Sequence, residues 1–590
     1  MSLTPRGMSI QEAYRLYADG KFLVNRRYQR KLVWSEQEKK HLIDSIQHNF
    51  PIPLFMFARV DHDDSALEVI DGMQRLNAIF SYIEHRFKDE SGFCFDVSQN
   101  PRARIQRDAG AFFEFPEEVM RLNDKECAAF LEYQLAVTID TEGDESRINE
   151  VFGRINSGGR RLSPQEQRQA GLVSGLSEFV RRLAMELRGD DSPDVLPLNQ
   201  MPAVSFNTPK ERQGYGVDAT DIFWCKHGII LPSDLAKAED EQVLADISIS
   251  LLNGSPLNAS REIFDNYFSS GSDEFNQIEQ KLASYGPDRL RSEIIAVISN
   301  IRATFETGSF LAIRTCAQEK PKNTARTAFF ALFNAYYNLM IKGGLLPDDF
   351  SGIRKSLAGF QNVLTMQAHY TKSEDRIKNI GITTGLIQNF FTRKDTPVIG
   401  GGHALVIDIE NSLRRSRFEA SRYEFKIGCC TLSDNPTLDP DMYSKLARTA
   451  AAIANASPDA DGFIYLGVAD KKSAAERVSE LFGGNYHQIG DVFFVGLLHD
   501  LKCLGINLES YIKKLIQELQ KTDLADPLKT QLITCLEHAE YRGAPFVRLR
   551  VPIQKELTSF RGEYPIRKNS DTVNMTAAET LSQSKLFLRS

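Results

Sequence analysis

The chain has 590 residues, of which 42% are hydrophobic and 25% are charged, and this composition is that of a globular protein rather than a disordered or fibrous one. Such a length predicts about three or four domains. The net charge of −7 argues against coating of nucleic acid by bulk charge but is compatible with a local basic groove. Because the eight cysteines form no C-x-x-C pair and no signal segment or membrane-length apolar run is present, we expect a cytoplasmic protein without a zinc ribbon, a disulfide framework or a membrane span.

Residues 1–180 are predicted to form the first domain. Its central feature is a buried strand that ends in an Asp-Gly turn and leads into a helix, an arrangement in which side chains and amides at a helix N-terminus can meet an anion. The expected elements are helices over Gln11–Tyr17 and from the N-cap Ser35 to Asn49, strands Leu54–Phe57 and Leu67–Ile70, and a helix from about Gln74.

Residues 181–395 form a mostly helical middle domain by their pattern, because apolar residues recur there at three- and four-residue spacing. The stretch Asp190–Asp218 is rich in Pro, Asp and Asn and is expected to be an exposed loop. The expected helices cover Leu176–Leu187, Phe275–Tyr285, Asp288–Phe305 and Thr327–Lys342.

A proline followed by three glycines near residues 394–402 predicts a flexible joint, after which residues 400–590 form a separate α+β domain. We therefore expect an α+β multidomain protein. The elements expected in this last domain are strands Tyr423–Ile427, Gly462–Val468, Phe546–Val551 and Tyr564–Ile566, and helices Pro440–Ala456 and Leu508–Leu519.

Three polar clusters in the first domain are candidates for binding a nucleotide or a nucleic-acid phosphate. Arginine forks match phosphate oxygens, and an aspartate at a strand-to-helix turn can hold a metal or polarise a water molecule. Taken singly, each cluster is also compatible with solvated arginines or an ordinary Asp-Gly turn. The candidate residues are Arg27, Gln29 and Arg30, then Asp71, Gly72, Gln74 and Arg75, and finally Asn156, which is accompanied by Arg154, Arg160 and Arg161.

At these positions the chain resembles the ParB-like domain of GmrS-type subunits of type IV restriction systems, which have a ParB/sulfiredoxin-like fold. The resemblance implies nucleotide binding and hydrolysis and restriction of modified phage DNA. Met73 replaces glutamine at the third position of the family's Asp-Gly-Gln-Gln-Arg motif, which removes one hydrogen-bonding group. The resembling segments are Arg27–Arg30, Leu42–Ile46, Pro51–Pro53, Val69–Leu76 and Val151–Asn156.

Members of this family often carry a C-terminal HNH nuclease domain, but the paired histidine and asparagine of such a domain are not found here. The late histidines are isolated in unrelated patterns and are expected to be ordinary surface or core residues. They are His487, His499 and His538. An effector domain of this chain is therefore expected to be of another kind.

The strand predicted over Tyr423–Ile427 carries an acid and a lysine on the face opposite Tyr423 and Phe425. Glu424 and Lys426 on one strand face can bind a divalent cation and contact a scissile phosphate, or they form an ordinary exposed ion pair. Three carboxylates, Glu419, Glu424 and Asp470, would make an oxygen-rich site suited to Mg²⁺ or Mn²⁺ if they converge.

The residues around these acids resemble the AlbA-like domain of the Schlafen family. Some members of that family are metal-dependent endoribonucleases that act on transfer or ribosomal RNA through a Glu-x₄-Glu pair and a later aspartate, and others bind nucleic acid without cutting it. The resemblance places the metal-binding and catalytic roles on Glu419, Glu424 and Asp470, with Lys426 beside them. It is carried by Glu424–Lys426, the helix end Ala451–Ala456, the strand Gly462–Asp470 and the late segment Gly562–Ser570.

Basic residues near this predicted site are candidates for holding an RNA or DNA backbone, which gives affinity without sequence choice. An ordinary solvated basic face explains the same pattern. The candidates are Arg422, Arg548, Arg550, Arg567 and Lys568, with Arg414, Arg415 and Arg417 nearby in the sequence.

These features support a leading hypothesis of an anti-phage defence protein. In it, the ParB-like domain senses a nucleotide or a nucleic acid, the helical middle transmits the signal or forms a homo-oligomer, and the Schlafen-like domain cuts RNA or DNA with Mg²⁺ or Mn²⁺. Two alternatives stay open. In one, the N-terminal domain hydrolyses a nucleoside triphosphate or nicks DNA while the C-terminal domain only binds nucleic acid; in the other, the protein is a non-catalytic DNA-binding regulator.

Overall fold

In a computed structural model, the chain forms two compact units, Met1–Val398 and Ile399–Ser590. The residues that the structure describes are 3–27, 31–60, 63–108, 119–140, 163–169, 174–190, 192–201, 204–205, 217–307, 309–318, 323–365, 372–393, 409–410, 412–413, 421–456, 460–489, 492–541, 544–568 and 571–587.

The first unit begins with a six-stranded mixed sheet in the order β1-β5-β3-β4-β2-β6. Strands β3 and β5 are parallel, as are β2 and β4, and the other neighbours are antiparallel. The strands are β1 (Leu3–Ser9), β2 (Phe22–Asn25), β3 (Phe55–Val60), β4 (Asp63–Asp71), β5 (Gln134–Asp140) and β6 (Val195–Pro197). The helices beside them are α1 (Ile10–Ala18), α2 (Glu36–Gln47), α3 (Met73–Ile83), α4 (Pro101–Asp108) and α5 (Asp124–Glu132), with a 3₁₀ turn η1 (Val97–Gln99).

The core of this part lies between the sheet and the helices α1, α2, α3 and α5. Phe22 and Phe57 of the strands contact each other, and Tyr17 stacks on Phe80 of α3 at 4.3 Å between ring centroids. Helix α3 is buried along most of its length because its apolar residues occur all round it. The sheet and α3 therefore fix the turn that joins β4 to α3.

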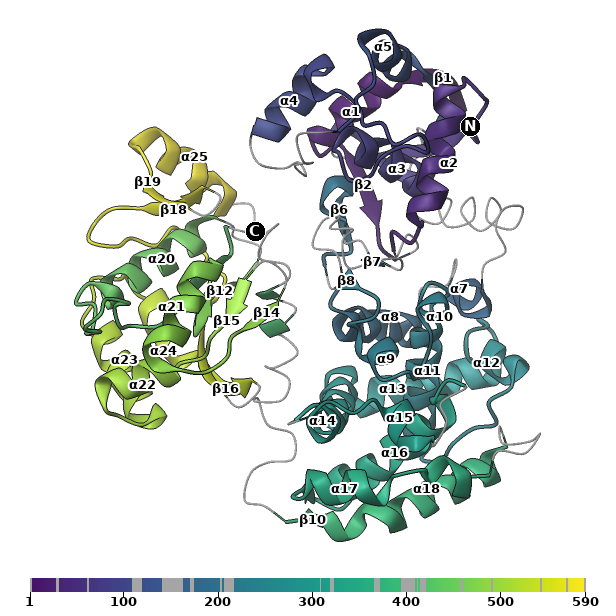
Figure 1. Ribbon diagram of the computed structural model, residues 1–590, viewed down its shortest axis with the longest axis vertical. Coiled ribbons are helices and arrows are strands. Elements are labelled where there is room, and N and C mark those ends of the chain that lie inside the picture. The colour runs from purple at the N-terminus through teal and green to yellow at the C-terminus, as the bar shows by residue number, and fades with distance from the viewer. Residues whose placement is uncertain are drawn as a thin grey trace. The chain divides into compact units, whose positions relative to one another are not determined.

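The described residues in the rest of the first unit are mostly helical, as Figure 1 shows. Helix α11 packs on α8 and α13, and α16 packs on α14 and α18. The helices are α7 (Pro164–Gln169), α8 (Gly175–Arg188), α9 (Phe223–Lys226), α10 (Pro232–Leu235), α11 (Glu239–Asn253), α12 (Arg261–Tyr267), α13 (Asp273–Tyr285), α14 (Pro287–Glu306), α15 (Ile313–Ala317), α16 (Arg326–Tyr337), α17 (Phe350–Ser356) and α18 (Ser373–Ile387). The shorter elements are η2 (Leu198–Gln200), a π-helical turn η3 (Asn338–Lys342), η4 (Phe360–Val363), η5 (Gln388–Phe390), β7 (Val204–Ser205), β8 (Val217–Asp218), β9 (Leu346–Pro347) and β10 (Phe391–Thr392).

The second unit has a four-stranded sheet in the order β11-β12-β17-β16 and a three-stranded sheet in the order β13-β15-β14. Strands β11 and β12 are parallel, and β17 is antiparallel to both of its neighbours. The strands are β11 (Tyr423–Lys426), β12 (Gly462–Leu466), β13 (Val468–Ala469), β14 (His487–Ile489), β15 (Val492–Phe494), β16 (Leu536–Tyr541), β17 (Ala544–Val551), β18 (Pro565–Lys568) and β19 (Asp571–Asn574). The helices are α20 (Met442–Ala456), α21 (Lys472–Phe482), α22 (Leu498–Leu504), α23 (Leu508–Gln520), α24 (Leu528–Thr534) and α25 (Ala577–Phe587).

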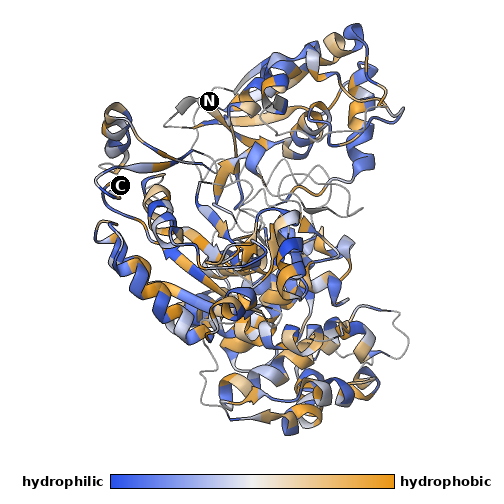
Figure 2. Ribbon diagram, turned by 60° about the vertical axis from the view of Figure 1, so that its left-hand side comes forward, coloured by the Kyte–Doolittle hydropathy of each residue, from blue (hydrophilic) through white to orange (hydrophobic). Residues whose placement is uncertain are grey.

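The expectation of a mixed α+β protein with several sheets is confirmed. Hydrophilic and hydrophobic residues alternate along the ribbons of both units in Figure 2, as expected for elements with one buried face. Among the described residues, no helix is long and apolar enough to cross a membrane. The domain limits at residues 180, 395 and 400 and the ParB-like and Schlafen-like assignments stay predictions.

The expected loop over Asp190–Asp218 is wrong in its first part. Asp190 is fully buried, Val195–Pro197 pairs with β2 as strand β6, and Leu196 and Leu198 belong to the core. Composition misled the expectation because Asp190 is neutralised by Arg188, two residues before it, and by Arg26, which lies far away in the sequence.

Candidate functional site

The turn between β4 and α3 places an acid at the start of a helix. Gly72 has φ of 102°, and a Cβ atom at this position would lie 2.4 Å from Cδ1 of the buried Phe55. Glycine is required by both the backbone conformation and the space. Asp71 therefore ends β4 directly beside the N-terminus of α3, where backbone amides and the helix dipole favour an anion.

Arg75 lies in the first turn of α3 and contacts Asp71. Its Nη2 atom is 2.7 Å from Asp71 Oδ2, and its guanidinium lies 5.0 Å above the centre of the Phe55 ring. The Asp71 side chain is 36% exposed and the Arg75 side chain 11%. The turn thus displays one carboxylate to solvent next to a guanidinium that is held in place from two sides.

Gln74, predicted to contact phosphate, has its amide engaged by backbone. Its Oε1 accepts hydrogen bonds from the amides of Val33 at 3.0 Å and Trp34 at 3.2 Å, and its Nε2 donates to the carbonyl of Lys31 at 2.6 Å. These bonds attach to α3 the segment that directly follows the basic run, which is the predicted cluster Arg27–Arg30. In this structure Gln74 positions that segment.

The basic run itself is partly described. Arg27 is 40% exposed and has its Nε 3.9 Å from Asp194 Oδ2. The other predicted members of the N-terminal site, Gln29, Arg30 and Asn156, lie outside the described residues, as do Arg154, Arg160 and Arg161.

The residues on either side of this run enter a buried ionic network, which pattern reasoning did not anticipate. Arg188 is at its centre, with Nε 3.0 Å from Asp190 Oδ1 and Nη1 2.5 Å from Asp240 Oδ2. Burial acts to lower the pKa of Arg188, but the surrounding carboxylates outweigh it and the pKa is raised. The network consists of the cations Arg26, Lys31 and Arg188 and the acids Asp190, Asp240 and Glu241.

This network balances three cations against three acids with side-chain exposures of 5% or less. Arg26 and Lys31 flank the basic run, whereas the acids and Arg188 belong to α8, α11 and the residues just after α8. The ends of the run are therefore fixed on the helical part of the first unit. Adjacent Asp240 and Glu241 at the start of a helix were the available signal in the sequence, but their partners are about 50 to 200 residues away in the chain.

In the second unit, Glu424 of β11 is held between two cations. Its Oε1 is 2.5 Å from Lys426 Nζ, and its Oε2 is 2.8 Å from Nη1 of Arg567, which comes from β18. The Glu424 side chain is 14% exposed, and Arg567 also donates to the Tyr423 carbonyl at 3.1 Å. Tyr423 belongs to the core, as expected for the face opposite Glu424.

The convergence of the three predicted acids stays a prediction. Glu424 pairs in register with Ile464 of β12, while Asp470 comes after the bend at Gly467 and is exposed. Glu419 lies outside the described residues. Within the described part of the chain, no group of three or more His, Cys, Asp or Glu side chains could hold a metal ion, so the described acids do not by themselves form a metal centre.

The predicted nucleic-acid-binding cations have partners within the second unit. Arg548 Nε donates to Glu537 at 2.7 Å and its guanidinium lies over the Phe463 ring, while Arg550 Nη2 is 2.5 Å from Asp461. Arg550 is 47% exposed and Arg548 is buried. The remaining pairs are Arg422 with the Asp461 carbonyl, Arg567 with Glu424 and Lys568 with Glu579. Four of these five cations therefore face a carboxylate of the same unit.

Comparison with protein families supports the first unit's expected resemblance. Residues 10–173 match the family described as GmrSD restriction endonuclease, N-terminal domain. The chain therefore contains a GmrSD N-terminal domain, and the match supports a nuclease role in restriction and contact with nucleic acid. Neither the curated proteins nor the solved structures contain a match to this chain.

Proposed function

We propose that the protein is a restriction-type nuclease of phage defence. The N-terminal domain senses a nucleotide or a nucleic acid with Asp71 and Arg75, the helical part transmits the signal or forms a homo-oligomer, and the second unit, as a Schlafen-like domain, cleaves RNA or DNA. The match at residues 10–173 supports the restriction role. The cleavage role rests on one observation, the placement of Glu424 between Lys426 and Arg567.

This placement suits a phosphodiester because carboxylate and cationic groups meet on one strand face. Lys426 is 31% exposed and available to contact phosphate oxygens, whereas Arg567 is 4% exposed and keeps the Glu424 carboxylate oriented. In the proposal, Glu424 holds Mg²⁺ or Mn²⁺ together with Glu419 and Asp470. The metal would supply an activated water and neutralise phosphate charge.

The alternative of an N-terminal hydrolase with a C-terminal binding domain is favoured by a different observation. Both oxygens of Glu424 already face cations, whereas Asp71 is more exposed and shares one oxygen with Arg75. An exposed acid beside an anion-binding helix start suits a metal-bound nucleotide. The two readings assign the chemistry to different units.

A cleavage panel separates them. Purified full-length protein is incubated with plasmid DNA, transfer RNA or ribosomal RNA and with Mg²⁺, Mn²⁺ or EDTA, with and without nucleoside triphosphates. We expect metal-dependent cleavage that Glu424→Gln abolishes and that Glu509→Gln, which alters an exposed ion pair on α23, leaves unchanged.

Cleavage that persists in Glu424→Gln refutes the C-terminal assignment. Nucleoside triphosphate turnover that is lost in Asp71→Asn and kept in Glu424→Gln selects the alternative. A third outcome is that the wild type cleaves no nucleic acid and turns over no nucleoside triphosphate while it still binds DNA in a salt-sensitive manner. That outcome would select the hypothesis of a non-catalytic DNA-binding regulator.

A further inference from the structure

The helical part of the first unit contains a cavity of about 320 Å³ that none of the predicted site residues line. This volume is at the lower end of the range of about 300–1,000 Å³ for small-molecule sites. The lining comes from α7, α11, α12, α16 and α18 and from the residues before α12, and it includes four arginines and two carboxylates. The arginines are Arg168, Arg261, Arg326 and Arg376.

Arg376 forms one wall of the cavity and is held rigidly. Its guanidinium lies 3.6 Å from the centre of the Phe330 ring, Nη2 is 2.5 Å from Asp246 Oδ2, and Nη1 donates to the Leu257 carbonyl at 2.7 Å. The side chain is 7% exposed. An arginine ordered in this way presents a fixed, flat cationic surface without further loss of side-chain entropy on binding.

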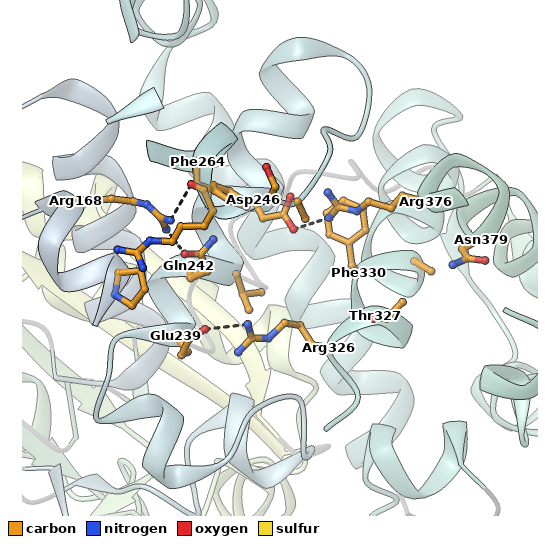
Figure 3. A pocket seen from close by; sticks show the side chains of 16 residues that line it. Arg168, Glu239, Gln242, Asp246, Phe264, Arg326, Thr327, Phe330, Arg376 and Asn379 are labelled. Carbon is orange, nitrogen blue, oxygen red and sulfur yellow. Dashed lines mark hydrogen bonds and ion pairs between the residues drawn. The ribbon is translucent and has the colours of Figure 1, made fainter. Parts of the chain in front are cut away.

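Arg168 is built into the cavity in a similar manner. Its side chain is 4% exposed, its Nε donates to Asp265 at 2.7 Å, and its guanidinium lies 5.4 Å from the centre of the Phe264 ring. Figure 3 shows Arg168 and Phe264 on one side of the space and Arg376 and Phe330 on another. Two arginine–phenylalanine pairs thus form preorganised walls.

The other two arginines are more exposed and retain donors. Arg326 is 40% exposed, and its salt bridge to Glu239 joins Nη1 to Oε2 at 2.9 Å. Arg261 is 65% exposed, and its Nη2 donates to Gln167 at 3.2 Å. Among the described residues, Arg326 Nε and Nη2 have no partner, so this guanidinium can donate to a ligand.

Apolar side chains complete the lining between these charges. A ligand that satisfies the cavity needs an anionic group for the exposed guanidiniums and a flat apolar part for the space between them. The apolar lining residues are Val243, Ala259, Phe264, Phe330 and Ala331.

We propose that this cavity binds a nucleoside phosphate, with the phosphate held by Arg261 and Arg326 and the base against the apolar lining. Guanidinium forks match phosphate oxygens, and aromatic and guanidinium planes stack on bases. The small volume suits a mononucleotide rather than a polynucleotide. None of the cavity's lining residues belongs to the turn with Asp71 and Arg75, for which nucleotide sensing is also proposed, so the test includes a variant of that turn.

Isothermal titration calorimetry of the full-length protein tests the proposal. The probes are adenosine and guanosine mono-, di- and triphosphates, with adenosine and inorganic phosphate as part-ligands. We expect Arg326→Gln and Arg261→Gln each to weaken nucleotide binding by about tenfold or more, since a charged hydrogen bond is lost. Ala259→Phe, which fills the apolar part and keeps every arginine, should weaken nucleotide binding but not the binding of phosphate.

Arg561→Gln, which alters the exposed ion pair of Arg561 with Asp523 in the second unit, is the matched control and should bind nucleotide as the wild type does. Arg75→Gln separates the two candidate sites and should retain cavity binding. Circular dichroism of each variant excludes misfolding as the cause of lost binding. The proposal is overturned if no nucleotide binds, if binding is lost in Arg75→Gln but kept in Arg326→Gln, or if Ala259→Phe has no effect on nucleotide affinity.

Discussion

Asp71 of the first unit and Glu424 of the second are both predicted to act on phosphate, yet their surroundings differ. Asp71 is 36% exposed and contacts one guanidinium, whereas Glu424 is 14% exposed and has a cation at each oxygen. Water screens an exposed pair, so the pair contributes little to stability, while removing one partner of a buried group leaves a charge that the fold must accommodate. Asp71 is therefore available to a ligand at small structural cost, whereas Glu424, beside its proposed role in cleavage, is part of the framework of its unit.

The largest effect is expected from Gly72→Ala, which alters the turn that carries the exposed Asp71. A left-handed backbone and a Cβ atom 2.4 Å from Phe55 together predict a loss of about 3 kcal/mol in the free energy of unfolding. Both tryptophans of the chain, Trp34 and Trp224, lie in the first unit, so urea unfolding followed by their fluorescence measures it. Gly254→Ala is the control, because Gly254 also has a positive φ but nothing within 4 Å of an added Cβ. Equal losses for the two variants would contradict the clash with Phe55.

Arg567→Leu tests whether the less exposed acid, Glu424, contributes to the stability of the second unit. It leaves Glu424 with Lys426 as its cation, and we expect a loss of about 2 kcal/mol in the stability of the second unit. Hydrogen exchange of residues 421–426 reports this loss, while the tryptophan fluorescence transition of the first unit should not move. Arg561→Leu, in an exposed pair of the same unit, should leave exchange unchanged. Unaltered exchange in Arg567→Leu would show that Glu424 is not part of the framework.

Glu84, directly after α3, extends the comparison to a carboxylate whose pKa is set mainly by burial. Burial raises the pKa of Glu84 to about 7, against the lowering effects of Arg86, at 3.9 Å, and of the Tyr17 hydroxyl. The folded state therefore binds this proton more tightly than the unfolded state, so its contribution to stability is full below the ordinary pKa of 4.5 and is lost as pH rises to about 7.

Glu84→Gln should remove this dependence, so its stability relative to the wild type should increase between pH 5 and pH 8. Urea unfolding followed by tryptophan fluorescence at the two pH values measures the change, with the exposed Glu132→Gln as control. A constant difference between Glu84→Gln and the wild type at both pH values would contradict the raised pKa.

The smallest structural effect is expected from Asp71→Asn. Because the Asp71 carboxylate is partly exposed, the loss should be below about 1 kcal/mol, similar to that of Asp19→Asn, which alters an equally exposed carboxylate paired with Arg102. Urea unfolding followed by tryptophan fluorescence measures the stability loss of both variants. A loss of several kcal/mol in Asp71→Asn would remove the contrast with Glu424.

Local sequence signals predicted much of the fold. Ser35 caps α2 through a full capping box with Glu38, and the helices expected from apolar spacing occur with ends shifted by a few residues. The Asp-Gly turn was found because its chemistry lies within adjacent residues. Strands β1, β2 and β5 were not anticipated, since their pairing partners lie elsewhere in the chain.

The sites were less predictable because their contacts are long-range. Spacing placed Glu424 and Lys426 on one strand face, and the structure confirms their contact, but Arg567 lies 143 residues further along the chain from Glu424. Gln74 matched a motif, but its bonds to the backbone near Lys31 could not be deduced from that motif. The cavity between α11, α12, α16 and α18 arises from packing alone, and no local pattern indicates it.

The six-residue ionic network also limits how this protein can be divided or recombined. A fragment that ends at residue 180 would retain Arg26 and Lys31 and lose the three acids of the network, Asp190, Asp240 and Glu241. Grafting the GmrSD N-terminal domain onto an unrelated effector would thus require the segment through α11 to be transferred with it, so the smallest exchangeable module is longer than the family match.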